Sequence, residues 1–114
     1  MKIIIKGKNI VIARQAKIAN FFGERLVGLM FKKNMGSMDA LLIKRCNSIH
    51  TCFMRFAIDA VFLDNNFKVI SVVRNIRPWR MTRFYRQARQ VLEMHASTLT
   101  DEIQIGDQLE VADV

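Results

Sequence analysis

The turn residues Asp64-Asn65-Asn66 separate two apolar segments, residues 58–63 and 67–73. Both segments are rich in Val, Ile and Phe, which favour strands, and both are shorter than a typical helix. Asp and Asn tolerate the backbone angles that a tight turn requires. The pattern therefore predicts an antiparallel β-hairpin in the middle of the chain, and this hairpin limits the possible folds more than any other feature.

Other short apolar segments predict further strands. They cover residues 2–6, 10–13, 40–43, 89–94 and 108–111, and a turn at Lys6-Gly7-Lys8-Asn9 joins the first two. Two segments predict helices instead, residues 20–31 and residues 98–103 after Ser97 as a cap. We expect one domain over residues 1–114 that is mostly β (α+β), a small β-barrel-like structure of about six to eight short strands with one or two short helices.

Positive charge is concentrated in one segment of the chain, whose net charge is +8. No acidic residue lies between Asp64 and Glu93, whereas arginine recurs there at every third position. The six arginines are Arg74, Arg77, Arg80, Arg83, Arg86 and Arg89. The rings of Trp79, Phe84 and Tyr85 are interleaved with them. Arginine binds phosphates and rings stack on bases, so we expect these residues to contact an anionic macromolecule, either a protein, a nucleic acid or a polyanionic sugar. The alternative is a solvated connecting loop.

No segment is apolar enough to suggest a membrane span or a secretory signal. A span needs about 20 apolar residues and a signal needs roughly 7–15. The first fifteen residues, MKIIIKGKNIVIARQ, contain only three consecutive isoleucines. We therefore expect a cytoplasmic protein without a transmembrane segment, in which both cysteines are reduced.

The segment CNSIHTCFMRFAID (46–59) contains most of the chemically reactive side chains. Cys46, His50 and Cys52 supply only three metal ligands, whereas structural zinc sites use four. We therefore expect no bound metal and no cofactor. A cysteine nucleophile activated by His50 is an alternative. The favoured interpretation is a strand whose cysteines and Met54 fill the core. In such a strand the side chains alternate, so that Cys46, Ser48, His50, Cys52 and Met54 share one face.

A binding site is expected near this segment. Its candidate residues are Ser48, His50, Met54, Asp59 and Trp79. Asp59 stands in an apolar segment, where an unpaired charge is unfavourable. Its carboxylate is expected either to accept backbone N–H groups, to pair with Arg55, or to bind a ligand.

Five segments resemble the DUF192 family, a domain of unknown function. They are RLVGLM (25–30), LLIKRCNSIHTCFMRFAIDAVFLD (41–64), KVISVVRNIRPWR (68–80), VLEM (91–94) and IQIGDQLEV (103–111), in the order of the family. The resemblance implies a compact β-rich domain with a short helix that carries RxxGLM. It implies no established activity, cofactor or partner.

The family positions found here are Arg25, Gly28, Met30, His50, Met54, Asp59, Glu93, Gly106 and Asp107. Two residues depart from the pattern, since Ala57 stands where proline is usual and Ser97 where glycine often follows the VLE strand. Arg25 and Glu93 are interpreted as partners of each other or of other charges. The favoured function is a noncatalytic binding or accessory domain with no catalytic residue. The alternatives are a small enzyme that uses His50 and Asp59 as acid and base, and a nucleic-acid-binding protein.

Overall fold

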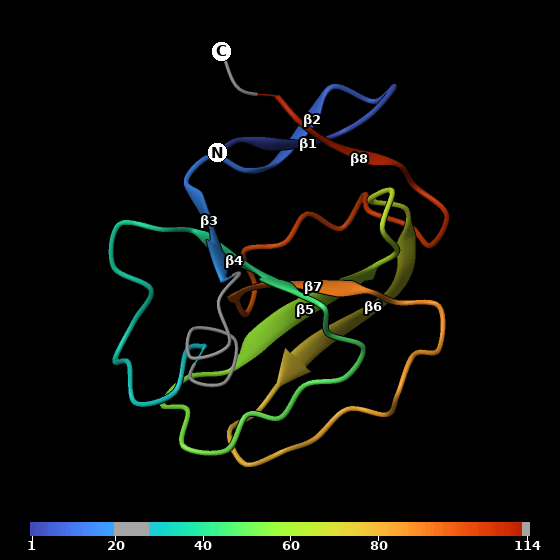
Figure 1. The fold of residues 1–114 in the computed structure, drawn as a ribbon. Coiled ribbons are helices and arrows are strands. Elements are labelled where there is room, and N and C mark those ends of the chain that lie inside the picture. Colours follow the sequence, from blue (N-terminus) through green and yellow to red (C-terminus); the bar gives the residue numbers. More distant parts are fainter. Residues whose placement is uncertain (20–27, 113–114) are drawn as a thin grey trace.

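The structure, a computed structural model, describes residues 1–19 and 28–112, and these form two β-sheets (Figure 1). The strands are β1 (Ile3–Ile5), β2 (Ile10–Ala13), β3 (Ala16–Ala19), β4 (Ala40–Lys44), β5 (Ile58–Leu63), β6 (Val69–Ile76), β7 (Gln90–His95) and β8 (Leu109–Val111). The fold is mostly β, as expected. Within the described residues there is no helix, and hence none that could cross a membrane.

The two sheets lie at different levels of the molecule. The smaller sheet has the antiparallel order β2-β1-β8, and the larger one has the order β3-β4-β7-β5-β6. Only β3 and β4 are parallel in the larger sheet. The expected barrel-like form is wrong, because β3 and β6 lie at opposite edges of the larger sheet and do not pair to close it.

Side chains alternate between the two faces of the larger sheet, and each face packs against a buried apolar cluster. From β7, Leu92 and Met94 pack in a cluster with Ile3 and Leu109 of the smaller sheet. Val91 belongs to the second cluster on the opposite face, which the irregular segment between β4 and β5 covers. By the same alternation, Glu93 lies on the face of Val91 and is surrounded by that second cluster.

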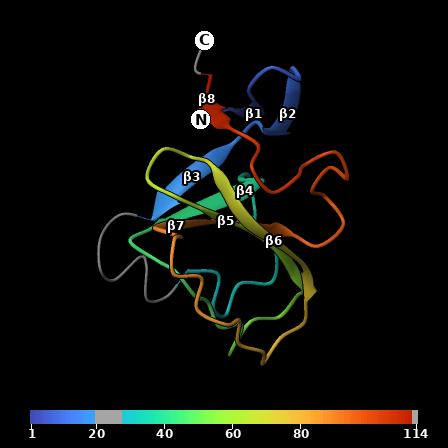
Figure 2. The same ribbon diagram turned by 90° about the vertical axis from the view of Figure 1, so that its right-hand side faces the viewer.

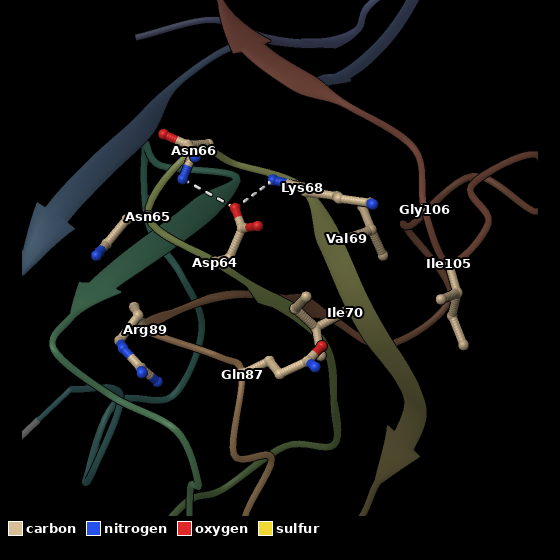
Figure 3. A pocket seen from close by; sticks show the side chains of 10 residues that line it. All are labelled: Asp64, Asn65, Asn66, Lys68, Val69, Ile70, Gln87, Arg89, Ile105 and Gly106. Atoms are coloured by element: carbon tan, nitrogen blue, oxygen red, sulfur yellow. Dashed lines mark hydrogen bonds between the residues drawn. The ribbon is translucent and has the colours of Figure 1, made fainter.

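The predicted central hairpin is confirmed, with β5 and β6 paired antiparallel. The Asp64 carboxylate closes its turn, since one oxygen accepts the backbone N–H of Asn66 at 2.8 Å and that of Lys68 at 2.9 Å (Figure 3). The hairpin of β1 and β2 is also confirmed. Both hairpins follow from local turn chemistry, which a sequence pattern can report.

The helix predicted over residues 98–103 is wrong, and the segment forms turns. The guanidinium of Arg74 binds the carbonyls of Leu99 at 3.1 Å and Thr100 at 2.7 Å, so these oxygens accept bonds from a side chain rather than from a helical backbone. Ser97 has a φ of +74° and does not cap a helix. Of the helix predicted over residues 20–31, residues 20–27 lie outside the described residues, and residues 28–31 form turns.

Candidate binding site

Residues 46–54 do not form the expected strand. Their one regular contact is an isolated bridge between His50 and Met81. The alternation of faces ends at Phe53, where a φ of +65° turns the chain, so that Phe53 is exposed and Met54 is buried. The residues at positions 46, 48, 50 and 54 nevertheless meet at one small cavity.

This cavity has a volume of about 80 Å³ and lies between the covering loops and β7. Three of the five expected binding residues line it, namely Ser48, His50 and Met54. Gly28, Met30 and Glu93 line it as well. Five of the nine positions that the family resemblance singled out therefore gather around a single cavity, although they are distant in sequence.

Glu93 contributes a buried carboxyl group to the cavity. Its backbone lies in β7 opposite Leu41 of β4 and Ala60 of β5, and only 3% of the residue is exposed. Burial raises the pKa of Glu93 to about 8, because the charged form loses its hydration. The predicted partner Arg25 lies outside the described residues.

The polar groups at the mouth of the cavity have defined roles. His50 Nδ1 accepts the backbone N–H of Cys52 at 3.2 Å, so the neutral ring carries its proton on Nε2. The thiol of Cys46 donates to the Ser48 carbonyl at 2.9 Å. Within residues 1–19 and 28–112, no three His, Cys, Asp or Glu side chains are grouped so that they could hold a metal ion.

Asp59 does not join this cavity. Its carboxylate is buried and accepts the backbone N–H groups of Asn75 at 2.8 Å and Ser97 at 3.2 Å. Asn75 has a φ of +53°, and the register between β5 and β6 shifts between Ile58 and Ala60. Asp59 thus fastens an irregularity in the sheet, which is the backbone role considered from the sequence. His50 and Asp59 are not brought together as an acid–base pair.

Thr51 connects the cavity to the arginine-rich segment, and sequence reasoning missed it. Its side chain is fully buried, and its hydroxyl donates to the Arg77 carbonyl at 2.6 Å and accepts the backbone N–H of Arg80 at 2.8 Å. Its backbone bonds to Arg80 and to Trp79 at 2.8 and 3.0 Å. The segments 46–54 and 77–85 therefore form one unit, at the end of the larger sheet far from the smaller sheet in both views (Figures 1 and 2).

Four of the six arginines line one groove of about 510 Å³. They are Arg74, Arg77, Arg80 and Arg83. Arg74 is the member that lies near a carboxylate, with 3.9 Å between its Nη1 and Oδ1 of Asp101. The other three are exposed, and no described residue forms an ion pair with them. We call this surface the arginine groove.

The remaining two arginines do not belong to the arginine groove. Arg86 is exposed outside it, and its carbonyl accepts a bond from the Arg89 guanidinium at 2.7 Å. Arg89 lines a separate hollow of about 590 Å³ at the end of the central hairpin, together with Asp64 and Gln87 (Figure 3). The period of three in the sequence therefore does not produce one continuous cationic surface.

Trp79 lies outside the cavity, on an exposed cluster of rings that we call the aromatic triad. Its ring centroid is 4.7 Å from that of Phe53, which is 5.3 Å from that of Phe31. All three have φ values of +65° or +66°, which bulky residues rarely adopt. The fold holds three strained residues so that 47–65% of each remains exposed, and strain of this kind is typical of functional sites.

Comparisons with known proteins agree with the sequence resemblance. The family DUF192, described as an uncharacterized ACR, matches residues 2–111. A UPF0127 protein from Pyrococcus horikoshii is 38% identical over 94 residues, which cover 80% of this chain and 81% of the relative.

Two solved structures have a similar fold. One, a protein of unknown function from Novosphingobium aromaticivorans, has a TM-score of 0.80 at 17% identity and covers 97% of this chain and 84% of its own. The other, from Sinorhizobium meliloti, has a name that proposes a transcription regulator, with a TM-score of 0.81 at 19% identity over 96% of this chain and 91% of its own. At these identities the two structures establish the fold alone.

Proposed function

Since the chain belongs to the DUF192 family, a family of unknown function, we propose a function from its own surface: it is a noncatalytic binding domain whose arginine groove contacts an anionic partner. The observation that carries this proposal is the exposure of Arg77, Arg80 and Arg83 without acidic partners among the described residues. With 18 Lys and Arg against 10 Asp and Glu, the chain cannot neutralise its own cations. An external anion relieves their mutual repulsion.

The backbone beneath the groove favours binding because it is already ordered. Thr51 holds the chain at Arg77 and Arg80, and the backbone N–H of Thr82 bonds to the Ile49 carbonyl at 2.9 Å. An ordered loop loses little conformational entropy on association, so more of the contact energy remains as affinity. The guanidinium groups themselves are exposed, so they can adapt to the spacing of the anions.

Among anionic partners, a single-stranded nucleic acid fits the surface best. Trp79 lies between Arg77 and Arg80 in sequence, which places the aromatic triad beside the arginine groove. Rings that stack on bases next to cations that bind phosphates are the usual means of binding single strands without sequence preference. The name of the Sinorhizobium meliloti protein proposes a transcription regulator. That name describes the other protein alone, but it is a further reason to test nucleic acid here.

Fluorescence anisotropy with a short labelled single-stranded DNA of mixed sequence tests this proposal. Replacing Arg77, Arg80 and Arg83 by Gln should weaken binding and lower the slope of log K against log salt by about 2, because each phosphate of a single strand that an arginine neutralises adds about 0.7 to that slope. The matched control replaces Lys6, Arg14 and Lys17 by Gln, which removes the same charge from exposed positions around β1–β3.

The control should keep most of the affinity. Equal losses of affinity in both triple variants would mean that net charge alone attracts the DNA, and the proposed groove would be rejected. A sulfated sugar of similar charge provides a second ligand. If it binds as tightly as the DNA and ignores Trp79→Ala, the partner is a polyanion without bases.

A further inference from the structure

Arg89, which the arginine groove does not include, lies where two hollows meet. The first is the hollow at the end of the central hairpin. The second has a volume of about 580 Å³, and Arg89 and Asn65, which lie on the same side of the hairpin turn, line both (Figure 3). Lys44, the last residue of β4, and Arg45 also line the second hollow, which we call the β4 hollow. Three cationic side chains from two distant segments therefore gather there.

The backbone holds these two segments together. Arg45 has a φ of +54°, so the chain turns directly after β4. The next residue, Cys46, donates its backbone N–H to the Arg89 carbonyl at 3.0 Å, and the Arg89 N–H donates to the Leu63 carbonyl at 2.7 Å. Because the backbone beneath the cations is already fixed by these bonds, a ligand that binds there orders little of the chain, and less entropy is lost on binding.

Two of the three cations are also held through their side chains. The Lys44 ammonium donates to Oε1 of Gln90 at 2.7 Å, and the amide nitrogen of Gln90 donates to the Asp64 carbonyl at 2.8 Å. Only 1% of Gln90 is exposed, so it is a firm support for the ammonium. Arg89 Nη1 donates to two backbone carbonyls of its own loop, at 2.7 and 2.9 Å. An ammonium has three N–H donors and a guanidinium has five, so both cations keep donors for a ligand.

The charge of the β4 hollow favours a doubly charged anion. None of the described residues that line it is acidic, and Asp64, which precedes Asn65, uses its carboxylate to close the hairpin turn. A carboxylate would offer one negative charge to three cations, whereas a phosphate monoester carries about 1.5 to 2 at neutral pH and has three acceptor oxygens. Arginine also binds phosphate through two parallel N–H···O bonds. A phosphate group therefore matches these cations better than a carboxylate does.

The size of the β4 hollow indicates a ligand larger than phosphate alone. Sites for small molecules have volumes of roughly 300–1,000 Å³, a range that includes this hollow. Asn47 and Asn65 add side-chain amides to its lining, and an amide can both donate to and accept from a hydroxyl group. We propose that the β4 hollow binds a small sugar phosphate. Its phosphate group contacts the three cations, and its hydroxyl groups contact the two amides.

The test is an amide NMR titration with glucose 6-phosphate and glucose 6-sulfate, two esters of nearly the same shape. At about pH 7.5 the phosphate ester is mostly doubly charged, whereas the sulfate ester carries a single charge. Glucose 6-phosphate should shift the signals of residues 44–47 and 88–89 saturably, and the sulfate should bind about tenfold more weakly. Inorganic phosphate should also bind more weakly, because it makes no contact with the amides.

A matched pair of variants locates the site. Arg89→Gln should weaken the binding of glucose 6-phosphate about tenfold, because the charged fork is lost. Arg86→Gln removes the same charge from an exposed side chain of the same loop that is not among those lining the hollow, and it should keep the affinity.

Three results on the wild-type protein would overturn the proposal without any variant. They are equal binding of the two esters, shifts that are largest at residues 77–83, and no binding of any of the three ligands. Inorganic phosphate that binds as tightly as glucose 6-phosphate would overturn the assignment of a sugar. Equal losses of affinity in Arg86→Gln and Arg89→Gln would mean that net charge alone attracts the ester, and the proposed site would be rejected.

Discussion

Replacing Thr51 by Val should destabilise the protein, because one hydroxyl joins the two loops of the site. Valine keeps the shape of the fully buried side chain and removes its hydroxyl. The Arg77 carbonyl is then deprived of a donor at 2.6 Å, and the backbone N–H of Arg80 is deprived of an acceptor at 2.8 Å. The perturbation therefore affects two backbone groups and leaves the apolar packing almost unchanged.

The expected destabilisation follows from these two groups. A buried polar group left without a partner costs about 1–3 kcal/mol, and two such groups near an exposed loop give an expected loss of stability of about 2–4 kcal/mol. Thr51→Ser is the control, since it keeps the hydroxyl and removes one buried methyl group, at about 1 kcal/mol. The two variants together separate the hydrogen bonds from the packing.

Urea unfolding followed by two signals measures the effect. The single tryptophan, Trp79, lies in the loop that Thr51 holds, so its fluorescence reports that loop, while circular dichroism reports the sheets. Thr51→Val should lower the free energy of unfolding by at least twice as much as Thr51→Ser. A decrease below about 0.5 kcal/mol for Thr51→Val in both signals would refute the reasoning, because removing a buried hydrogen bond costs more than that amount.

Three further predictions concern other parts of the site. Asp59→Ala should lower the free energy of unfolding by about 2–4 kcal/mol in urea, since two backbone amides lose a charged acceptor; a decrease under about 1 kcal/mol would contradict this role. The free energy of unfolding should fall by about 1 kcal/mol for each unit as the pH rises from about 5 to 8. The reason is that folded Glu93, with its pKa raised to about 8, keeps a proton that the unfolded chain releases near its usual pKa of 4.5. Glu93→Gln should flatten that profile in urea unfolding at several pH values, and parallel profiles would count against a raised pKa. Trp79→Ala should weaken DNA binding by about 1–3 kcal/mol without changing the salt slope, whereas Phe84→Ala, an exposed ring outside the aromatic triad, should have little effect in the same anisotropy assay.

The parts of the fold that sequence predicted are those set by local chemistry. The hairpin around Asp64 depends on turn residues and on the β-branched segments beside them. β3 was not predicted, because Ala16–Ala19 has weak strand propensity and depends on its parallel pairing with β4. Ser97 was expected to cap a helix over residues 98–103, but its φ of +74° does not fit a cap, and the Arg74 side chain takes the carbonyls of Leu99 and Thr100. The barrel-like form was predicted wrongly because closure depends on whether the edge strands β3 and β6 pair with each other, and no local sequence pattern indicates that pairing.

The candidate site was predicted in part for a similar reason. Ser48, His50 and Met54 do share a cavity, but the turn at Phe53 ended the alternation on which the grouping was based. Glu93 reaches the same cavity only through the pairing of β7 with β4 and β5. The sequence around Thr51 indicates its role only weakly, since it is a small polar residue between His50 and Cys52. Its hydrogen bonds cross to residues 77–80, a separation that periodicity does not encode.

The most direct test of the proposed function is to map where a single strand binds. An amide NMR titration with a short oligothymidylate should move the signals of Phe31, Arg74 and residues 51–53 and 77–83 most, because these residues include the aromatic triad and the arginine groove. Shifts that are largest at the hairpin around Asp64 and Arg89, or around β1–β3, would contradict the proposed function. The binding site would then have to be sought on that other surface.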